Sequence, residues 1–209
     1  MGYGSKSSDI REGASLGHGV HKKVNLVEVK KHITEPKKGA DAGYDVLDYI
    51  FKNKKGDQYV YRIFNPEGGD DETKVAKAQK DASDKVVYIA SKISNKEVEL
   101  NGDKINSWDD FTTEAIALLP EGFEKIDLDI KLVGSVYQGK ANVGAPNIYQ
   151  GGWIGGGWIK RSDSKDELTL SEQDKKSIAQ YEETIKKSSN SAPAGAAPAM
   201  GSGDGDVVF

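Results

Sequence analysis

The strictest hydrophobic pattern in the chain is a period-two alternation over residues 125–132. Ile126, Leu128, Ile130 and Leu132 occupy every second position, and charged residues occupy the positions between them. Successive side chains of a β-strand point to opposite faces of a sheet, so the pattern predicts a strand. The fold must therefore contain a sheet that covers a core.

Other strands are predicted on both sides of this one. Segments rich in β-branched and aromatic residues lie at about residues 22–29, 44–51 and 59–64, and a last strand is expected around residues 141–154. Turn-forming Pro and Gly residues separate them. In the second strand, one face is formed by Leu47, Tyr49 and Phe51.

Helical patterns fill the space between the third and fourth strands. Apolar residues recur every three or four positions between Val75 and Ile93, which is typical of an amphipathic helix. A second helix is predicted from Ser107, a favourable N-cap, to Leu119. A third is predicted to begin at Ser171 and to end near residue 187.

This order of elements predicts a mainly β, α+β fold, specifically a five-stranded barrel of the oligonucleotide-binding (OB) type with a helical insertion. A β-sandwich would need about seven strands. The predicted parts are a flexible arm over 1–20, a barrel domain over 21–160 with its insertion at about 70–119, a helix over 161–187 and a disordered acidic tail over 188–209.

Composition argues against several kinds of site. The chain has no cysteine, which excludes disulfides, thiolate catalysis and Cys-based zinc sites. The three histidines, His18, His21 and His32, are expected to be solvated, and no nucleophilic triad is visible. Residues 134–140 match the phosphate-loop pattern GxxxxGK, but Ala141 follows in place of the required Ser or Thr, so a hairpin is predicted. We expect the protein to have no enzymatic activity and to bind no metal ion or cofactor.

The charge is unevenly distributed. The net charge is −4, but residues 1–66 carry +4, residues 67–133 carry −7 and residues 134–209 carry −1. A basic first third can attract phosphate in spite of the negative total. No apolar run is long enough for a membrane helix, and residues 1–20 do not resemble a secretory signal, so we expect a cytoplasmic protein.

Basic and aromatic residues are interleaved in the predicted strands. Binding of single-stranded nucleic acid requires flat aromatic rings for the bases and cations for the backbone. The candidates are Lys22, Lys23, Lys30, Lys31, Lys52, Tyr59, Tyr61, Arg62, Tyr137, Trp153 and Trp158. The alternative is that the aromatic residues belong to the core or to an edge loop and the lysines to a solvated face. Alternation separates Tyr59, Tyr61 and Ile63 from Val60, Arg62 and Phe64 without showing which set is outside.

The C-terminus ends in an acidic segment with a terminal aromatic residue. Asp204 and Asp206 precede Phe209, after a linker of Ala, Pro, Gly and Ser. Such a tethered peptide can place its aromatic ring in an apolar pocket and its carboxylates beside basic residues of a partner. We therefore predict a partner-docking tail.

These segments together resemble phage-encoded single-stranded DNA-binding proteins with an OB fold. The resemblance is carried by GYDVLDYIFKNKKGDQYVYRIF at 43–64, SWDDF at 107–111, IDLDIKLVGSVYQGKANVGAPNIY at 126–149 and the tail GDGDVVF at 203–209. It implies a non-enzymatic, largely sequence-independent binder in phage DNA replication or recombination, in the host cytoplasm. It also implies recruitment of a polymerase, helicase or primase through the tail.

Two points are left open by the sequence. A homo-oligomer is possible for such a chain. A structural or virion-associated β-barrel protein that does not bind nucleic acid is the alternative function.

Overall fold

The computed structural model describes residues 14–36, 42–67, 71–146, 148–149, 152–153 and 157–191. The strands are β1 Gly19–Ile33, β2 Asp45–Lys52, β3 Gln58–Phe64, β4 Leu128–Tyr137, β5 Lys140–Gly144, β6 Ile148–Tyr149, β7 Gly152–Trp153 and β8 Ile159–Arg161. The helices are α1 Glu72–Ser94, α2 Trp108–Ala117 and α3 Glu172–Ser191, with 3₁₀ turns over Gly102–Lys104 and Phe123–Lys125. The predicted mixture of strands and helices is confirmed.

The main sheet has six strands, and its long first strand joins two halves. The order is β3-β2-β1-β4-β5, every neighbouring pair is antiparallel, and β8 pairs with β4. Residues 19–24 of β1 pair with β4, whereas residues 25–33 pair with β2. Irregularities in both registers, with a left-handed φ of 57° at Lys23, allow β1 to bend between the halves.

The described sheet is open, since β3 and β5 are its two ends and do not pair with each other. The five-stranded OB-type barrel stays a prediction, since the described strands form a mostly antiparallel open sheet and do not show a closed barrel. The sequence also missed the short strand β8, and it predicted one strand where β5, β6 and β7 lie. Two- and three-residue strands are too short to show a hydrophobic period.

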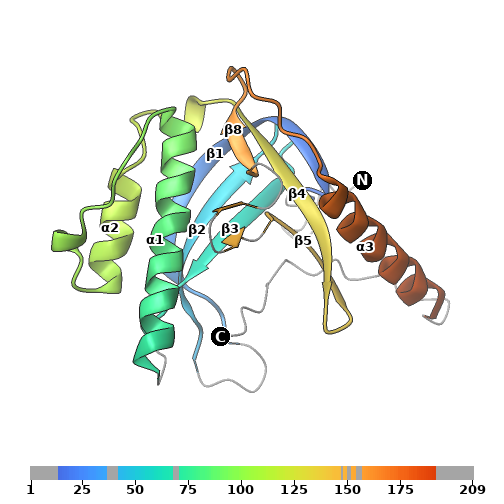
Figure 1. Cartoon of the computed structure of the whole chain (residues 1–209), viewed down its shortest axis with the longest axis horizontal. Helices are drawn as coiled ribbons and strands as arrows, with labels where there is room; N and C mark the ends of the chain where they lie inside the picture. Colours follow the sequence, from blue (N-terminus) through green and yellow to red (C-terminus); the bar gives the residue numbers. More distant parts are fainter. Residues whose placement is uncertain are drawn as a thin grey trace, which may run out of the picture.

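The core lies between the sheet and α1 (Figure 1). On β2 and β3 the facing pairs are Leu47 with Ile63, Tyr49 with Tyr61 and Phe51 with Tyr59. Trp158 is fully buried against this face, with ring centroids 5.0 Å from Tyr61 and 5.8 Å from Phe51. The prediction that Leu47, Tyr49 and Phe51 share a face is confirmed, and that face is buried.

The predicted helices begin at capped positions. The Asp71 carboxylate accepts hydrogen bonds from the backbone N–H groups of Thr73 and Lys74 at the start of α1. Ser107 accepts from the N–H of Asp110 at the start of α2, as predicted. Helix α3 begins beyond Ser171 and extends past the predicted end at residue 187. Local capping chemistry explains why these starts were predictable.

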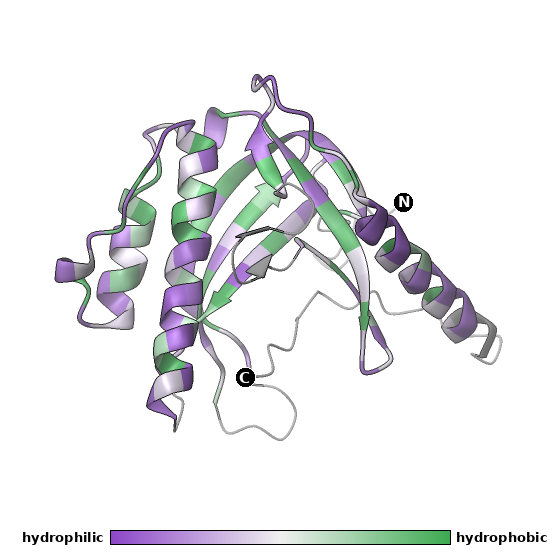
Figure 2. Ribbon diagram, in the orientation of Figure 1, coloured by the Kyte–Doolittle hydropathy of each residue, from purple (hydrophilic) through white to green (hydrophobic). Residues whose placement is uncertain are grey.

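The strand with the strict alternation has both faces covered. Its alternating apolar residues Leu128, Ile130 and Leu132 are buried, but Asp129 and Lys131 are also buried, with 6% and 0% of their surface exposed. Helix α3 packs against β4, and most of its residues are polar (Figure 2). Close packing requires Gly134, because a Cβ there would lie 2.5 Å from the Tyr181 ring. The polar side of this strand is therefore buried at Asp129 and Lys131 and not solvated there.

The structure also bears on the GxxxxGK segment and on the N-terminal arm. The GxxxxGK segment is a hairpin, as predicted, with Tyr137 opposite Lys140 and left-handed φ angles at Gln138 and Gly139. Within the predicted arm over 1–20, Leu16 is buried and Gly19 begins β1, and residues 1–13 lie outside the described part of the chain. Among the described residues, no helix has the length and apolarity needed to cross a membrane.

Candidate nucleic-acid interface

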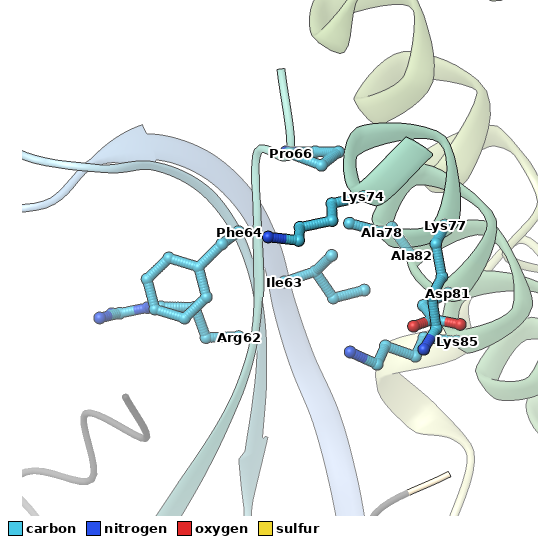
Figure 3. Close-up of a pocket in the computed structure, with 10 residues that line it drawn as sticks. All are labelled: Arg62, Ile63, Phe64, Pro66, Lys74, Lys77, Ala78, Asp81, Ala82 and Lys85. Carbon is cyan, nitrogen blue, oxygen red and sulfur yellow. The ribbon is translucent and has the colours of Figure 1, made fainter. Parts of the chain in front are cut away.

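The structure decides which side of β3 is available to a ligand. Tyr59, Tyr61 and Ile63 point to the core, because they lie opposite Phe51, Tyr49 and Leu47. The side chains of Arg62 and Phe64 project to the other side of the strand, away from α1 (Figure 3). The side of β3 that carries Val60, Arg62 and Phe64 is therefore the one that faces away from the core, which alternation alone did not show.

We call this side of the β1–β3 sheet the outer face. By register it consists of Glu28, Lys30 and His32 of β1, Val46, Asp48, Ile50 and Lys52 of β2, and Gln58, Val60, Arg62 and Phe64 of β3. Lys30 and Lys52 are exposed on it, and Arg62 and His32 are partly exposed. The middle of β2 is buried on this side too, since Val46, Asp48 and Ile50 have little or no exposed surface.

A buried carboxylate organises the centre of the outer face. Asp48 accepts two hydrogen bonds from Arg62, Nε at 2.8 Å and Nη2 at 2.9 Å, and its Oδ2 lies 2.8 Å from His32 Nε2. Burial acts to raise the pKa of Asp48, but the hydrogen bonds from Arg62 and His32 outweigh it and hold the pKa below its ordinary value. The bidentate pair fixes the Arg62 guanidinium in one orientation.

An aromatic pair lies at the end of the outer face where β2 begins and β3 ends. Tyr44 is 51% exposed, and its ring meets that of Phe64 edge to face with centroids 5.7 Å apart. Neither residue was among the sequence candidates. Alternation placed Phe64 beside Arg62, but only the packing of the opposite face shows that this side is outside.

The predicted lysines divide into three locations. Lys30 and Lys52 lie on the outer face. Lys31 lies on the opposite side, where its ammonium group bonds to Asp109 of α2. Lys22 and Lys23 are exposed at the bend of β1, and Lys23 lines a shallow depression with Arg161 and Asp163. The structure therefore does not bring all five lysines to one surface.

Three of the predicted stacking residues belong to the core. Trp158 has no exposed surface, and Tyr61 stacks on it. The Tyr59 hydroxyl accepts a hydrogen bond of 2.8 Å from the N–H of Ala145, and burial raises the pKa of both tyrosines. Their rings pack against other core side chains, so these three residues are corrected from ligand contacts to core residues.

The other predicted residues lie elsewhere. Tyr137 is 48% exposed at the turn between β4 and β5, where its ring is accessible. The side chain of Trp153 lies outside the described part of the chain, as do Asp204, Asp206 and Phe209. Of the histidines, His32 is held by Asp48, and His18 lies 3.4 Å from Glu182 of α3.

No protein-family description matches the sequence, and no curated protein is significantly similar to it. Within the described ranges, no three His, Asp or Glu side chains are grouped so that they could hold a metal ion. A functional conclusion therefore rests on the geometry and chemistry of the outer face.

Proposed function

We propose that the chain binds single-stranded DNA, largely without sequence preference, on its outer face. The observation that carries the proposal is the placement of an accessible aromatic pair, Tyr44 and Phe64, on the same face as Lys30, Lys52 and Arg62. Aromatic rings stack on unpaired bases of any sequence, and cations attract the phosphates between them.

The strand order supports an OB-like fold in a partly open form. A long, bent first strand pairs with both β2 and β4, and α1 and α2 lie between the third and fourth strands of the sequence. OB folds are partly open barrels that bind oligonucleotides on the face of strands 2 and 3 and on the loops after strands 1 and 4. In Figure 1 the last part of β1 and the β4–β5 turn both lie toward the bottom of the view, although the register places them at opposite ends of the bent β1.

Each group on the outer face has a distinct part in the proposed complex. The exposed ring of Tyr44 and the adjacent Phe64 are the stacking platform, with Tyr137 as a further ring at the β4–β5 turn. Lys30 and Lys52 attract phosphates, and Asp48 holds Arg62 in a fixed direction. The acidic groups Glu28 and Asp48 reduce the net charge, so we expect a modest salt dependence.

The biological setting follows from the resemblance described above. A sequence-independent binder of this kind would protect exposed strands in phage DNA replication or recombination. The tail with Asp204, Asp206 and Phe209 would recruit a polymerase, helicase or primase. We propose this recruitment by the tail together with DNA binding by the outer face.

The proposal is tested by fluorescence anisotropy of labelled oligo-dT at several salt concentrations. Label on the DNA is preferable to protein fluorescence, because Trp108 and Trp158 are buried. We expect saturable binding and a log–log salt slope of about −0.7 for each phosphate neutralised. The double variant Lys30→Glu/Lys52→Glu should bind more weakly, whereas the exposed control Lys96→Glu should not. Absence of binding by the unaltered chain at low salt would overturn the proposal and favour the structural alternative.

A further inference from the structure

One edge of β3 has backbone groups that point away from the sheet. The hydrogen bonds from Asn53 to Asp57 and from Asn65 to Asp45 fix the bonded positions of the β2–β3 ladder. Bonded and non-bonded positions alternate in an antiparallel pair, so the N–H and C=O groups of Val60, Arg62 and Phe64 face outward. Strand β3 is the end of the main sheet.

One end of this edge already carries an added segment. The N–H of Leu16 donates to the carbonyl of Gln58 at 2.8 Å, and the N–H of Gln58 donates to the carbonyl of Ala14 at 2.9 Å. These bonds make a short parallel bridge through Ser15. Beyond Gln58, none of the described strands pairs with the edge. The edge therefore already pairs with an extended segment at Gln58. The rest of the edge, from Val60 to Phe64, extends beyond that segment.

A cavity of about 340 Å³ lies along the continuing edge, between β3 and α1 (Figure 3). Its apolar lining comes from Ile63, Phe64, Pro66, Ala78 and Ala82. Charged groups of α1 also line it, namely Lys74, Lys77, Asp81 and Lys85. The cavity is thus apolar at the strand and predominantly cationic at the helix.

The positive charge around the cavity is incompletely neutralised. Three lysines of α1 face one aspartate, and the closest described ion pair of Lys74 is with Asp71 at 3.7 Å. Burial lowers the pKa of Lys85, and the charge of Asp81 only partly opposes this effect. Within the described ranges, Lys77 and Lys85 have no ion-pair partner within 4.0 Å. An anionic ligand would relieve this imbalance.

We infer that the β3 edge and this cavity bind an extended acidic peptide from a partner protein, which adds a strand to the sheet. A peptide backbone can use both the donors and the acceptors of Val60 and Phe64, whereas a phosphate could use only the donors. Side chains alternate along the added strand, so every second one faces α1. Acidic residues at those positions would reach Lys74, Lys77 and Lys85.

This inference concerns the edge of β3 and the cavity beside α1, which adjoin the outer face at Arg62 and Phe64, and it does not depend on DNA binding. The probe is a short fluorescein-labelled peptide of alternating glutamate and valine, with a lysine–valine peptide for comparison. Binding is measured by anisotropy with the full chain. We expect Lys77→Glu to weaken binding of the acidic peptide by about fivefold or more, through loss and reversal of an ion pair. The exposed control Lys96→Glu should bind like the unaltered chain.

A second variant tests the backbone contact. Val60→Pro removes an N–H group that faces away from β2, so the β2–β3 ladder keeps its hydrogen bonds. We expect it to lose peptide binding and to keep the circular dichroism spectrum and the urea unfolding midpoint of the unaltered chain. Correctly folded Val60→Pro protein that binds the peptide normally would overturn the inference.

Other outcomes would also overturn it. Equal binding of the lysine–valine peptide would show that the charge of the cavity does not select the ligand. Weakening of oligo-dT binding alone by Lys77→Glu would assign the cavity to DNA. Peptide binding seen only after deletion of residues 192–209 would make the chain's own tail the occupant. Failure of oligo-dT binding with normal peptide binding would contradict the proposed function and leave this inference supported.

Discussion

The ammonium group of Lys131 lies 2.9 Å from a carboxylate oxygen of Asp174, and both side chains are buried where β4 meets α3. Asp174 also accepts a hydrogen bond from the N–H of Ser171 at the start of the helix. One carboxylate therefore caps α3 and joins it to the sheet. A buried charge that loses its partner is strongly destabilising.

The first prediction concerns this pair. Asp174→Ala removes the carboxylate that pairs with the buried ammonium group of Lys131, and we expect it to lower the free energy of unfolding by about 3–5 kcal/mol. Urea denaturation measures the change. The double variant Lys131→Met/Asp174→Ala should recover part of the loss, because the buried charge is removed. Glu172→Ala, at an exposed pair with Lys175 on the same helix, should change stability by under about 1 kcal/mol.

The second prediction is the direction of acid denaturation. Burial acts to raise the pKa of Asp174, but hydrogen bonds from Lys131 and Ser171 hold it below the ordinary value of 3.8, and the pKa of Asp48 is lowered similarly by Arg62 and His32. A lowered folded-state pKa stabilises the fold above the unfolded pKa, and this contribution is lost as the pH falls through the folded pKa. Thermal melts should therefore change little through these groups above about pH 5 and fall steeply below about pH 4. If Asp174→Asn and Asp48→Asn leave the dependence of the melting temperature on pH unchanged below about pH 4, these two carboxylates do not cause the acid denaturation.

The third prediction concerns the contact between Gly134 and Tyr181. A Cβ at position 134 would lie 2.5 Å from the ring, so Gly134→Ala must displace Tyr181 and with it part of α3. We expect a loss of about 1–3 kcal/mol, as in other overpacked contacts. The variant Gly134→Ala/Tyr181→Ala should relieve the steric clash, and a double-mutant cycle of urea unfolding measures the coupling. Additive effects of the two substitutions would argue against the contact.

The fourth prediction tests the aromatic pair of the outer face. Phe64→Ala and Tyr44→Ala should each reduce oligo-dT affinity, by about 1–3 kcal/mol for a stacking residue. Ile116→Ala, at an exposed apolar position on α2, serves as the control. If anisotropy gives the same affinity for both aromatic variants and the control, DNA does not use this platform.

The fifth prediction separates the structural and ligand contributions of Arg62. Arg62→Ala leaves the buried carboxylate of Asp48 with His32 alone, and we expect a stability loss of about 1.5–3 kcal/mol. Arg62→Ala/Asp48→Ala removes both charges and should regain part of that stability. If oligo-dT affinity stays low in the stable double variant, Arg62 contacts DNA. If affinity recovers, the role of Arg62 is only to stabilise the fold.

Much of the fold could be predicted from local signals. The helix starts at Ser107 and Ser171 follow from capping chemistry, and the shared face of Leu47, Tyr49 and Phe51 follows from alternation. These features depend on residues close together in the sequence. The short strand β8 has too few residues to show any period, and its pairing with β4 is a long-range contact.

The sequence alone determined the order of the long strands and the helices and the basic character of the first third. The tertiary structure decided which face of each strand is covered. The alternating pattern of β3 would be the same whichever of its two sides was buried. The packing of α1 and Trp158 makes Tyr59 and Tyr61 core residues and leaves Phe64 outside. The strict alternation of β4 likewise concealed that α3 buries Lys131, because a buried ion pair and a solvated lysine have the same sequence pattern.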